Sequence, residues 1–171
     1  MKMRWITFGL SAVFLAAAGE SFGQTEDKEP SAILEIGGTA GQSLSDGKAS
    51  FGPNLAVEVT PIEHWLEIEA GISPLLNGGR TEVDTDVVFK KPFTLSDTAE
   101  LMIGAGPEWV HTNGRRGSAN SIAGEAVFDF MFWPWPGRNY GWYLEPSYDY
   151  NFGGGHEQSL GASVGLLISI P

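Results

Sequence analysis

Carboxylates spaced two residues apart recur along this 171-residue chain, and their spacing could support chemistry. Glu67 and Glu69 form one pair, and Glu82, Asp84 and Asp86 form a run of three. Side chains two positions apart lie on the same face of a β-strand, so these groups would converge on one surface. Clustered carboxylate oxygens can bind a hard cation such as Ca²⁺. They would equally suit a cation-conducting path or a hydrogen-bonded polar plug, and the sequence leaves these three alternatives open.

Nucleophilic catalysis is poorly supported, because the chain has three histidines and no cysteine. Asn113 stands two positions after His111, where a His-x-Ser motif would have its serine, and an asparagine side chain cannot act as the nucleophile. His156 precedes Glu157 and Ser159, but adjacent residues of a strand face opposite sides. The third histidine adjoins a tryptophan at an expected turn. We therefore expect no catalytic residues, no enzyme activity and no cofactor.

The elements that would position the carboxylates are β-strands with one apolar face and one polar face. Leu101, Ile103 and Trp109 lie on one side of such a segment, and Glu100 and Glu108 lie on the other. A hydrophobic period of two residues is typical of a half-buried strand. Helical periodicity is absent after the N-terminal segment. The pattern therefore predicts an all-β protein.

Eight segments carry this alternation. They cover residues 32–40, 51–60, 64–73, 81–93, 99–112, 119–133, 139–152 and 158–170. Gly-rich polar loops are expected at 41–50, 74–80, 113–118 and 153–157, and turns rich in Pro, Asp or Asn at 61–63, 94–98 and 134–138. Loops and short turns alternate in this way in an up-and-down barrel whose two chain ends lie on one side. We predict an eight-stranded antiparallel up-and-down β-barrel.

The two predicted faces differ in charge. No residue assigned to the first face is charged, and a charge there would cost about 2–4 kcal/mol at the centre of a bilayer. The second face carries Glu35, Glu58, Glu67, Glu69, Asp84, Asp86, Glu100, Glu108, Glu125, Asp129, Glu145 and Asp149. Glu82 joins this set, and Lys90 is its one clear base. We expect the apolar face to meet lipid and the carboxylates to line the lumen, which in so narrow a barrel is filled by side chains.

Aromatic residues fall at two heights of the predicted barrel. At the rim with the short turns lie Trp65, Trp133, Trp135, Tyr140 and Trp142, and toward the other rim lie Trp109, Tyr148 and Tyr150. Tyrosine and tryptophan favour membrane–water interfaces, because an apolar ring there carries a polar edge. Two such girdles predict a transmembrane barrel.

The N-terminal segment and the charge balance bound the location and the partners. Residues 1–23 have the basic start, short apolar stretch and small residues of a cleaved signal peptide, 24–31 form a flexible lead-in, and 32–171 form the barrel domain. The apolar stretch is shorter than the roughly 20 residues that a spanning helix needs. The formal net charge of −11 argues against nucleic acid as a partner.

With an export signal, eight strands and two aromatic girdles, the chain resembles the small outer-membrane β-barrel proteins of Gram-negative bacteria, the OmpA-like/OmpW-like barrel group. The resemblance covers nearly all of the mature chain. It implies an outer-membrane location, contact with lipid and lipopolysaccharide, and assembly by the barrel-insertion machinery. Arg80, Arg115 and Arg116 lie in expected outer loops and would contact lipopolysaccharide phosphates.

The function that we expect is a structural or membrane-maintaining one, with an acidic polar lumen. One alternative is a narrow porin-like channel for cations or small solutes. Another is a soluble periplasmic barrel that turns its apolar face inward around an apolar ligand, as lipocalins do. The sequence decides neither the oligomeric state nor whether the carboxylates bind a metal.

Overall fold

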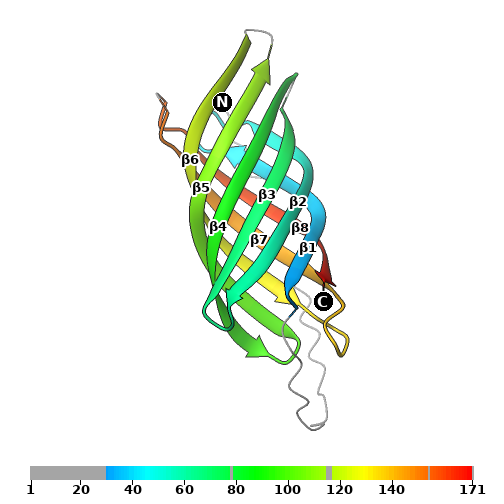
Figure 1. The fold of residues 1–171 in the computed structure, drawn as a ribbon. Helices are drawn as coiled ribbons and strands as arrows, with labels where there is room; N and C mark the ends of the chain where they lie inside the picture. Colours follow the sequence, from blue (N-terminus) through cyan, green and yellow to red (C-terminus); the bar gives the residue numbers. More distant parts are fainter. Residues whose placement is uncertain (1–29, 78, 115–116, 154, 171) are drawn as a thin grey trace, which may run out of the picture.

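A computed structural model describes residues 30–77, 79–114, 117–153 and 155–170. The predicted signal peptide, most of the lead-in, Arg115 and Arg116 lie outside these residues. The described residues form eight strands, shown in Figure 1. Their bounds are β1 Ala32–Ser43, β2 Ala49–Ile62, β3 Leu66–Asn77, β4 Arg80–Ser96, β5 Ala99–Gly114, β6 Gly117–Phe132, β7 Tyr140–Asn151 and β8 Gln158–Ile170.

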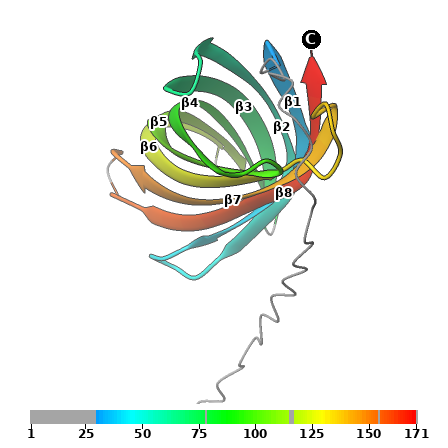
Figure 2. The same cartoon turned by 90° about the horizontal axis from the view of Figure 1, so that it is seen from below.

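The strands form one closed antiparallel barrel, in which each strand pairs with its neighbours in the chain. β1 and β8 close the ring over a register that runs from Ala32 opposite Ile170 to Ser43 opposite Ser159. Figure 2 shows these two strands side by side. The predicted fold class is confirmed. No helix in the described part of the chain is long and apolar enough to cross a membrane.

The barrel has two distinct ends. We call the end with the β1–β2, β3–β4, β5–β6 and β7–β8 connections the loop end, which is uppermost in Figure 1, and the opposite end the turn end. β1 begins and β8 finishes at the turn end. The hairpins at the loop end continue their pairing further than the sequence predicted, for example to Gly114 opposite Gly117.

The third strand begins later than predicted. His64 has a φ of 58°, in the left-handed region that strands do not use. The backbone N–H of Trp65 donates to the carbonyl of Ile62, which closes a turn. His64 and Trp65 therefore belong to the β2–β3 turn, and β3 starts at Leu66.

Alternation along each strand separates an exposed apolar surface from a buried polar one. On β1, Glu35 is 1% exposed and its neighbour Ile36 is 45% exposed. Exposed large apolar side chains occur on every strand, among them Ile36, Leu55, Ile72, Phe89, Ile103, Phe128, Leu144 and Leu166. The apolar face is thus outside and the carboxylate face inside, the reverse of what a lipocalin-like binder requires.

Two glycines allow the barrel to close tightly. A Cβ atom added to Gly37 would lie 2.3 Å from the carbonyl oxygen of Val164, and one added to Gly165 would lie 2.4 Å from that of Ile36. Gly37 and Gly165 face each other across the β1–β8 seam. Larger residues would collide there with backbone rather than with a movable side chain, which explains the need for glycine at both positions.

Candidate functional site: the acidic lumen

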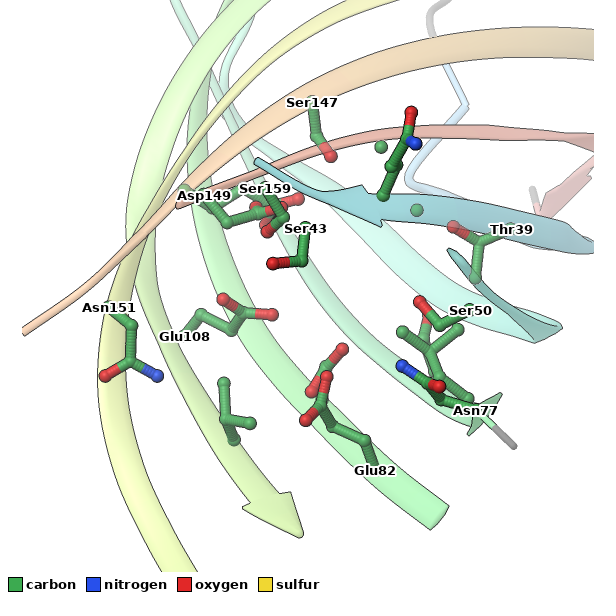
Figure 3. A pocket seen from close by; sticks show the side chains of 18 of the residues that line it. Thr39, Ser43, Ser50, Asn77, Glu82, Glu108, Ser147, Asp149, Asn151 and Ser159 are labelled. Carbon is green, nitrogen blue, oxygen red and sulfur yellow. The ribbon is translucent and has the colours of Figure 1, made fainter. Parts of the chain in front are cut away.

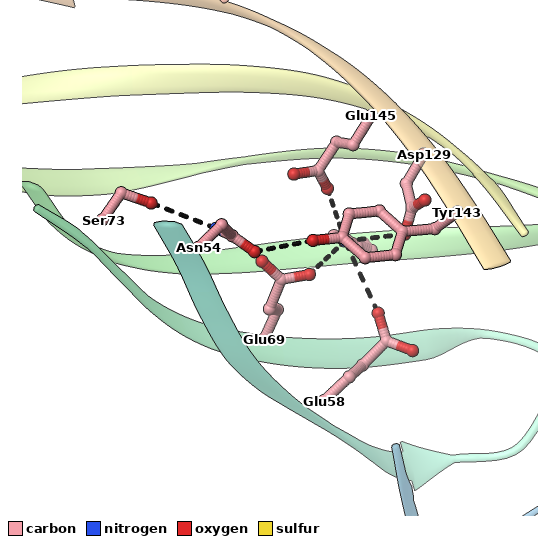
Figure 4. Close-up of polar contacts among 8 residues, drawn as sticks. Asn54, Glu58, Glu69, Ser73, Asp129, Tyr143 and Glu145 are labelled. Atoms are coloured by element: carbon pink, nitrogen blue, oxygen red, sulfur yellow. Dashed lines mark hydrogen bonds and ion pairs between the residues drawn. The ribbon is translucent and has the colours of Figure 1, made fainter. Parts of the chain in front are cut away.

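A buried lysine lies at the centre of the lumen. Lys90 is 1% exposed and projects inward from β4. Its ammonium group donates to a carboxylate oxygen of Glu69, to Asp129 Oδ2 at 2.9 Å and to Glu145 Oε2 at 2.7 Å. Glu58 Oε2 lies 3.6 Å from the same nitrogen. Figure 4 shows these carboxylates converging from different strands.

We call this group, together with Glu35, the Lys90 cluster. Every member is buried: Glu35 and Glu58 are 1% exposed, and Asp129 is 0% exposed. Five carboxylates therefore face a single ammonium group. An isolated charge is very costly away from water, so the ion pairs of Lys90 are what makes this burial tolerable.

A tyrosine extends the polar network toward the loop end. The hydroxyl of Tyr143 donates to Asn54 Oδ1 at 2.7 Å, and Asn54 Nδ2 donates to Ser73 Oγ at 3.1 Å. Tyr143 is fully buried, although β7 carries it between the exposed residues Trp142 and Leu144. The network links the neighbouring strands β2 and β3 to β7 through the lumen (Figure 4).

An apolar layer fills the lumen toward the turn end. It consists of the buried residues Ile33, Met102, Met131, Trp133, Tyr143 and Leu167. Beyond it, Arg138 of the β6–β7 turn donates to Glu100 Oε2 at 3.1 Å. Glu67 and Glu100 line a small recess there, beside Trp133 and Arg138. The described side chains thus fill the half of the lumen that is nearer the turn end.

The half of the lumen that is nearer the loop end contains a cavity of about 440 Å³, which we call the vestibule. Its wall carries serine, threonine and asparagine side chains together with six carboxylates: Glu82, Asp84, Asp86, Glu108, Glu125 and Asp149. Figure 3 labels Glu82, Glu108 and Asp149 among them. Thr112 Oγ1 donates to Glu82 at 3.2 Å, and Ser159 Oγ donates to Asp149 at 3.0 Å. Glu69 and Glu145 also line it. The Lys90 cluster therefore forms the floor of the vestibule.

Each predicted lumen carboxylate has a place in this arrangement. Five of them surround Lys90, namely Glu35, Glu58, Glu69, Asp129 and Glu145. Two lie at the turn end, namely Glu67 and Glu100. The other five line the vestibule, namely Asp84, Asp86, Glu108, Glu125 and Asp149. Lys90 itself was noted as an inward base but was not assigned to a site. Tyr143 and Asn54 were missed, although their alternation with Glu145 and Glu58 places them inside.

Most predicted girdle aromatics lie on the outside of the barrel. Four are exposed at the turn end, namely Trp65, Trp135, Tyr140 and Trp142. Toward the loop end, Trp109 of β5 and Tyr148 of β7 are exposed, and Tyr150 is half-buried. Trp142 stacks on Phe132 with 4.0 Å between ring centroids.

The assignment of Trp133 to the girdle was wrong. This residue is 1% exposed and belongs to the apolar layer inside the barrel. Its backbone N–H donates to the carbonyl of Thr98 at 2.8 Å, which continues the β5–β6 pairing by one residue. Because Phe132 faces outward, the alternation of the strand turns Trp133 inward.

The remaining predicted residues are not gathered into a site. Arg80 is exposed at the start of β4 and lines the mouth of the vestibule, on the lumen side of the strand. His111 Nδ1 is paired with Asn120 Oδ1 at 2.6 Å, and His156 Nδ1 with the hydroxyl of Tyr150 at 3.2 Å. The described hydrogen bonds place no serine or threonine hydroxyl on either of these imidazoles.

Comparison with known proteins supports the fold. No protein-family model matches the chain, and no curated protein matches it in sequence. Among solved structures, the chain is similar to Neisserial surface protein A, with a TM-score of 0.65, 12% identity, and coverage of 81% of this chain and 96% of that one. The N-terminal barrel domain of Pseudomonas aeruginosa OprF gives a TM-score of 0.59, 11% identity, and coverage of 82% and 100%.

The attachment invasion locus protein Ail of Yersinia pestis is also similar, with a TM-score of 0.56, 16% identity, and coverage of 82% of this chain and 99% of that one. At these identities the likeness shows the fold alone. The chain thus has the fold of the small eight-stranded barrels found among outer-membrane proteins.

Replacing Lys90 tests the energetic role of the cluster. Lys90→Met removes the ammonium group and leaves its carboxylates unpaired, so we expect a loss of about 3–5 kcal/mol in the free energy of unfolding near neutral pH. Urea titration of the folded protein in detergent, followed by tryptophan fluorescence, measures this change. Lys48→Met is the matched control, because Lys48 is a solvent-exposed loop residue paired with Asp46. Equal effects of the two substitutions would contradict the role given to Lys90.

Proposed function

We propose that this protein is a bacterial outer-membrane β-barrel with a structural, membrane-maintaining role and no catalytic activity. The observation that carries the proposal is the belt of exposed apolar side chains on all eight described strands, with the carboxylates on the lumen side. Lys91 interrupts the belt near the turn end, where its ammonium group reaches the carbonyl of His64 in the β2–β3 turn. Soluble monomeric proteins rarely expose a contiguous apolar surface of this kind. Lipid around the belt would remove the cost of exposing it to water.

Several features support this location. Exposed tryptophans and tyrosines lie near both ends of the belt, where they would meet the two membrane interfaces. Every strand is paired on both sides, so the barrel presents no open sheet edge to lipid. The partners would then be outer-membrane lipid and, at the loop end, lipopolysaccharide, after insertion by the assembly machinery. Arg80 at the vestibule mouth, with Arg115 and Arg116, would supply the cationic contacts.

A structural role is favoured over conduction because side chains fill the half of the lumen that is nearer the turn end. An ion entering from the loop end would reach the vestibule floor at Lys90 and then the layer that contains Met102, Met131 and Leu167. The open acidic vestibule is the specific observation that keeps a narrow cation channel as the second candidate. The proposal of no catalytic activity is supported by the partners of two histidines, because His111 is paired with Asn120 and His156 with Tyr150 rather than with a serine or threonine hydroxyl.

The lipid-facing belt is tested with two leucines. Leu55 lies at the middle of β2 and Leu44 in the β1–β2 connection, and both are about half exposed. Leu55→Arg should lower the stability of the protein folded in phosphatidylcholine vesicles by about 2–4 kcal/mol, because it places a charge near the bilayer centre. Leu44→Arg should change it little. If both substitutions are equally harmless, lipid does not surround β2.

Conduction is tested in planar bilayers. We expect the inserted protein to give no steady ionic current, because the Lys90 cluster and the apolar layer close the lumen. A wide porin inserted under the same conditions serves as the positive control. A steady, cation-selective current from the wild-type protein would instead establish the channel function.

A further inference from the structure

Two carboxylates of the Lys90 cluster have buried oxygens that accept no hydrogen bond from a described N–H or O–H donor. These are both oxygens of Glu58 and one oxygen of Glu35. Lysine has three N–H donors, and those of Lys90 are directed at Glu69, Asp129 and Glu145. All three donors of the lysine are therefore used, and its single positive charge is shared among five carboxylates, of which Glu58 Oε2 lies 3.6 Å from its nitrogen.

The unpartnered groups lie close enough together to share a small cation. One oxygen from each of Glu35, Glu58, Glu69 and Asp129 lies within 4.8 Å of the other three. Ca²⁺ binds oxygen ligands at about 2.3–2.6 Å, so oxygens on opposite sides of the ion are up to about 5 Å apart. Asp129 could serve both cations, because Oδ2 accepts from Lys90 and Oδ1 has no partner.

We propose that Glu35, Glu58, Glu69 and Asp129 bind one hard divalent cation of the Ca²⁺ class beside Lys90. The ion supplies the positive charge that the centre of the lumen lacks, since the part-buried ion pair of Arg138 with Glu100 lies at the turn end. Glu69 and Glu145 open onto the vestibule, so the ion enters from the loop end along a wall of carboxylates. The inference does not depend on the membrane location, because the site lies wholly inside the barrel.

The experiment is a calorimetric titration of the folded, chelator-treated protein in detergent with CaCl2 at neutral pH, together with its thermal unfolding with and without Ca²⁺. We expect one saturable site and a higher melting temperature in Ca²⁺, because the ion binds only the folded arrangement. Glu58→Gln removes one anionic ligand at nearly constant volume and should weaken binding at least about tenfold.

Glu108→Gln is the matched control. It also neutralises a buried lumen carboxylate, but Glu108 lines the vestibule and is not one of the four ligands. Binding should survive in Glu108→Gln. If Glu58→Gln does not fold, as judged by its heat-dependent gel mobility, Glu35→Gln takes its place.

Two outcomes would overturn the proposal. If the wild-type protein binds no Ca²⁺, protons neutralise the carboxylates of the cluster. If binding is lost in Glu108→Gln and kept in Glu58→Gln, the ion is held by the vestibule wall instead.

Discussion

The rest of the structure depends on the ion pairs between Lys90 and the carboxylates around it. A barrel of this width has no room for bulk water at its centre, so charged side chains that point inward are desolvated. Without a cation among them, each carboxylate would have to give up its charge or the strands would have to separate. One lysine from β4 holds Glu69, Asp129 and Glu145, which belong to β3, β6 and β7. It thereby ties the neighbouring strands β3 and β4 to β6 and β7 across the lumen.

The interior and exterior are two consequences of one pattern. A strict alternation along the strands sends carboxylates inward and aliphatic or aromatic side chains outward, and the β1–β8 pairing prevents either set from changing sides. A shift of one residue in register would exchange the two faces and place carboxylates in the apolar surroundings of the belt. The polar centre and the apolar belt therefore specify the same register.

The fold was predictable from the sequence because the period of two survives in every strand. The same period predicted which carboxylates point inward. It could not predict which of them meet, because alternation fixes the face of a strand and not the height that its tilt gives it relative to distant strands. The gathering of Glu35, Glu58 and Asp129 around Lys90 therefore needed the structure. Trp133 was misplaced for a different reason: its position next to a turn obscured the alternation that continues through it.

The location and the role of this protein both depend on contact between the apolar belt and lipid. The most direct measurement is fractionation of cells that produce the protein, with the membrane fraction then compared unboiled and boiled on detergent gels. Recovery in the outer membrane, with a band whose mobility changes on boiling, is the predicted result, because a closed barrel resists detergent until it is heated. Recovery as a soluble periplasmic protein would contradict the account, since the belt described here would then be exposed to water.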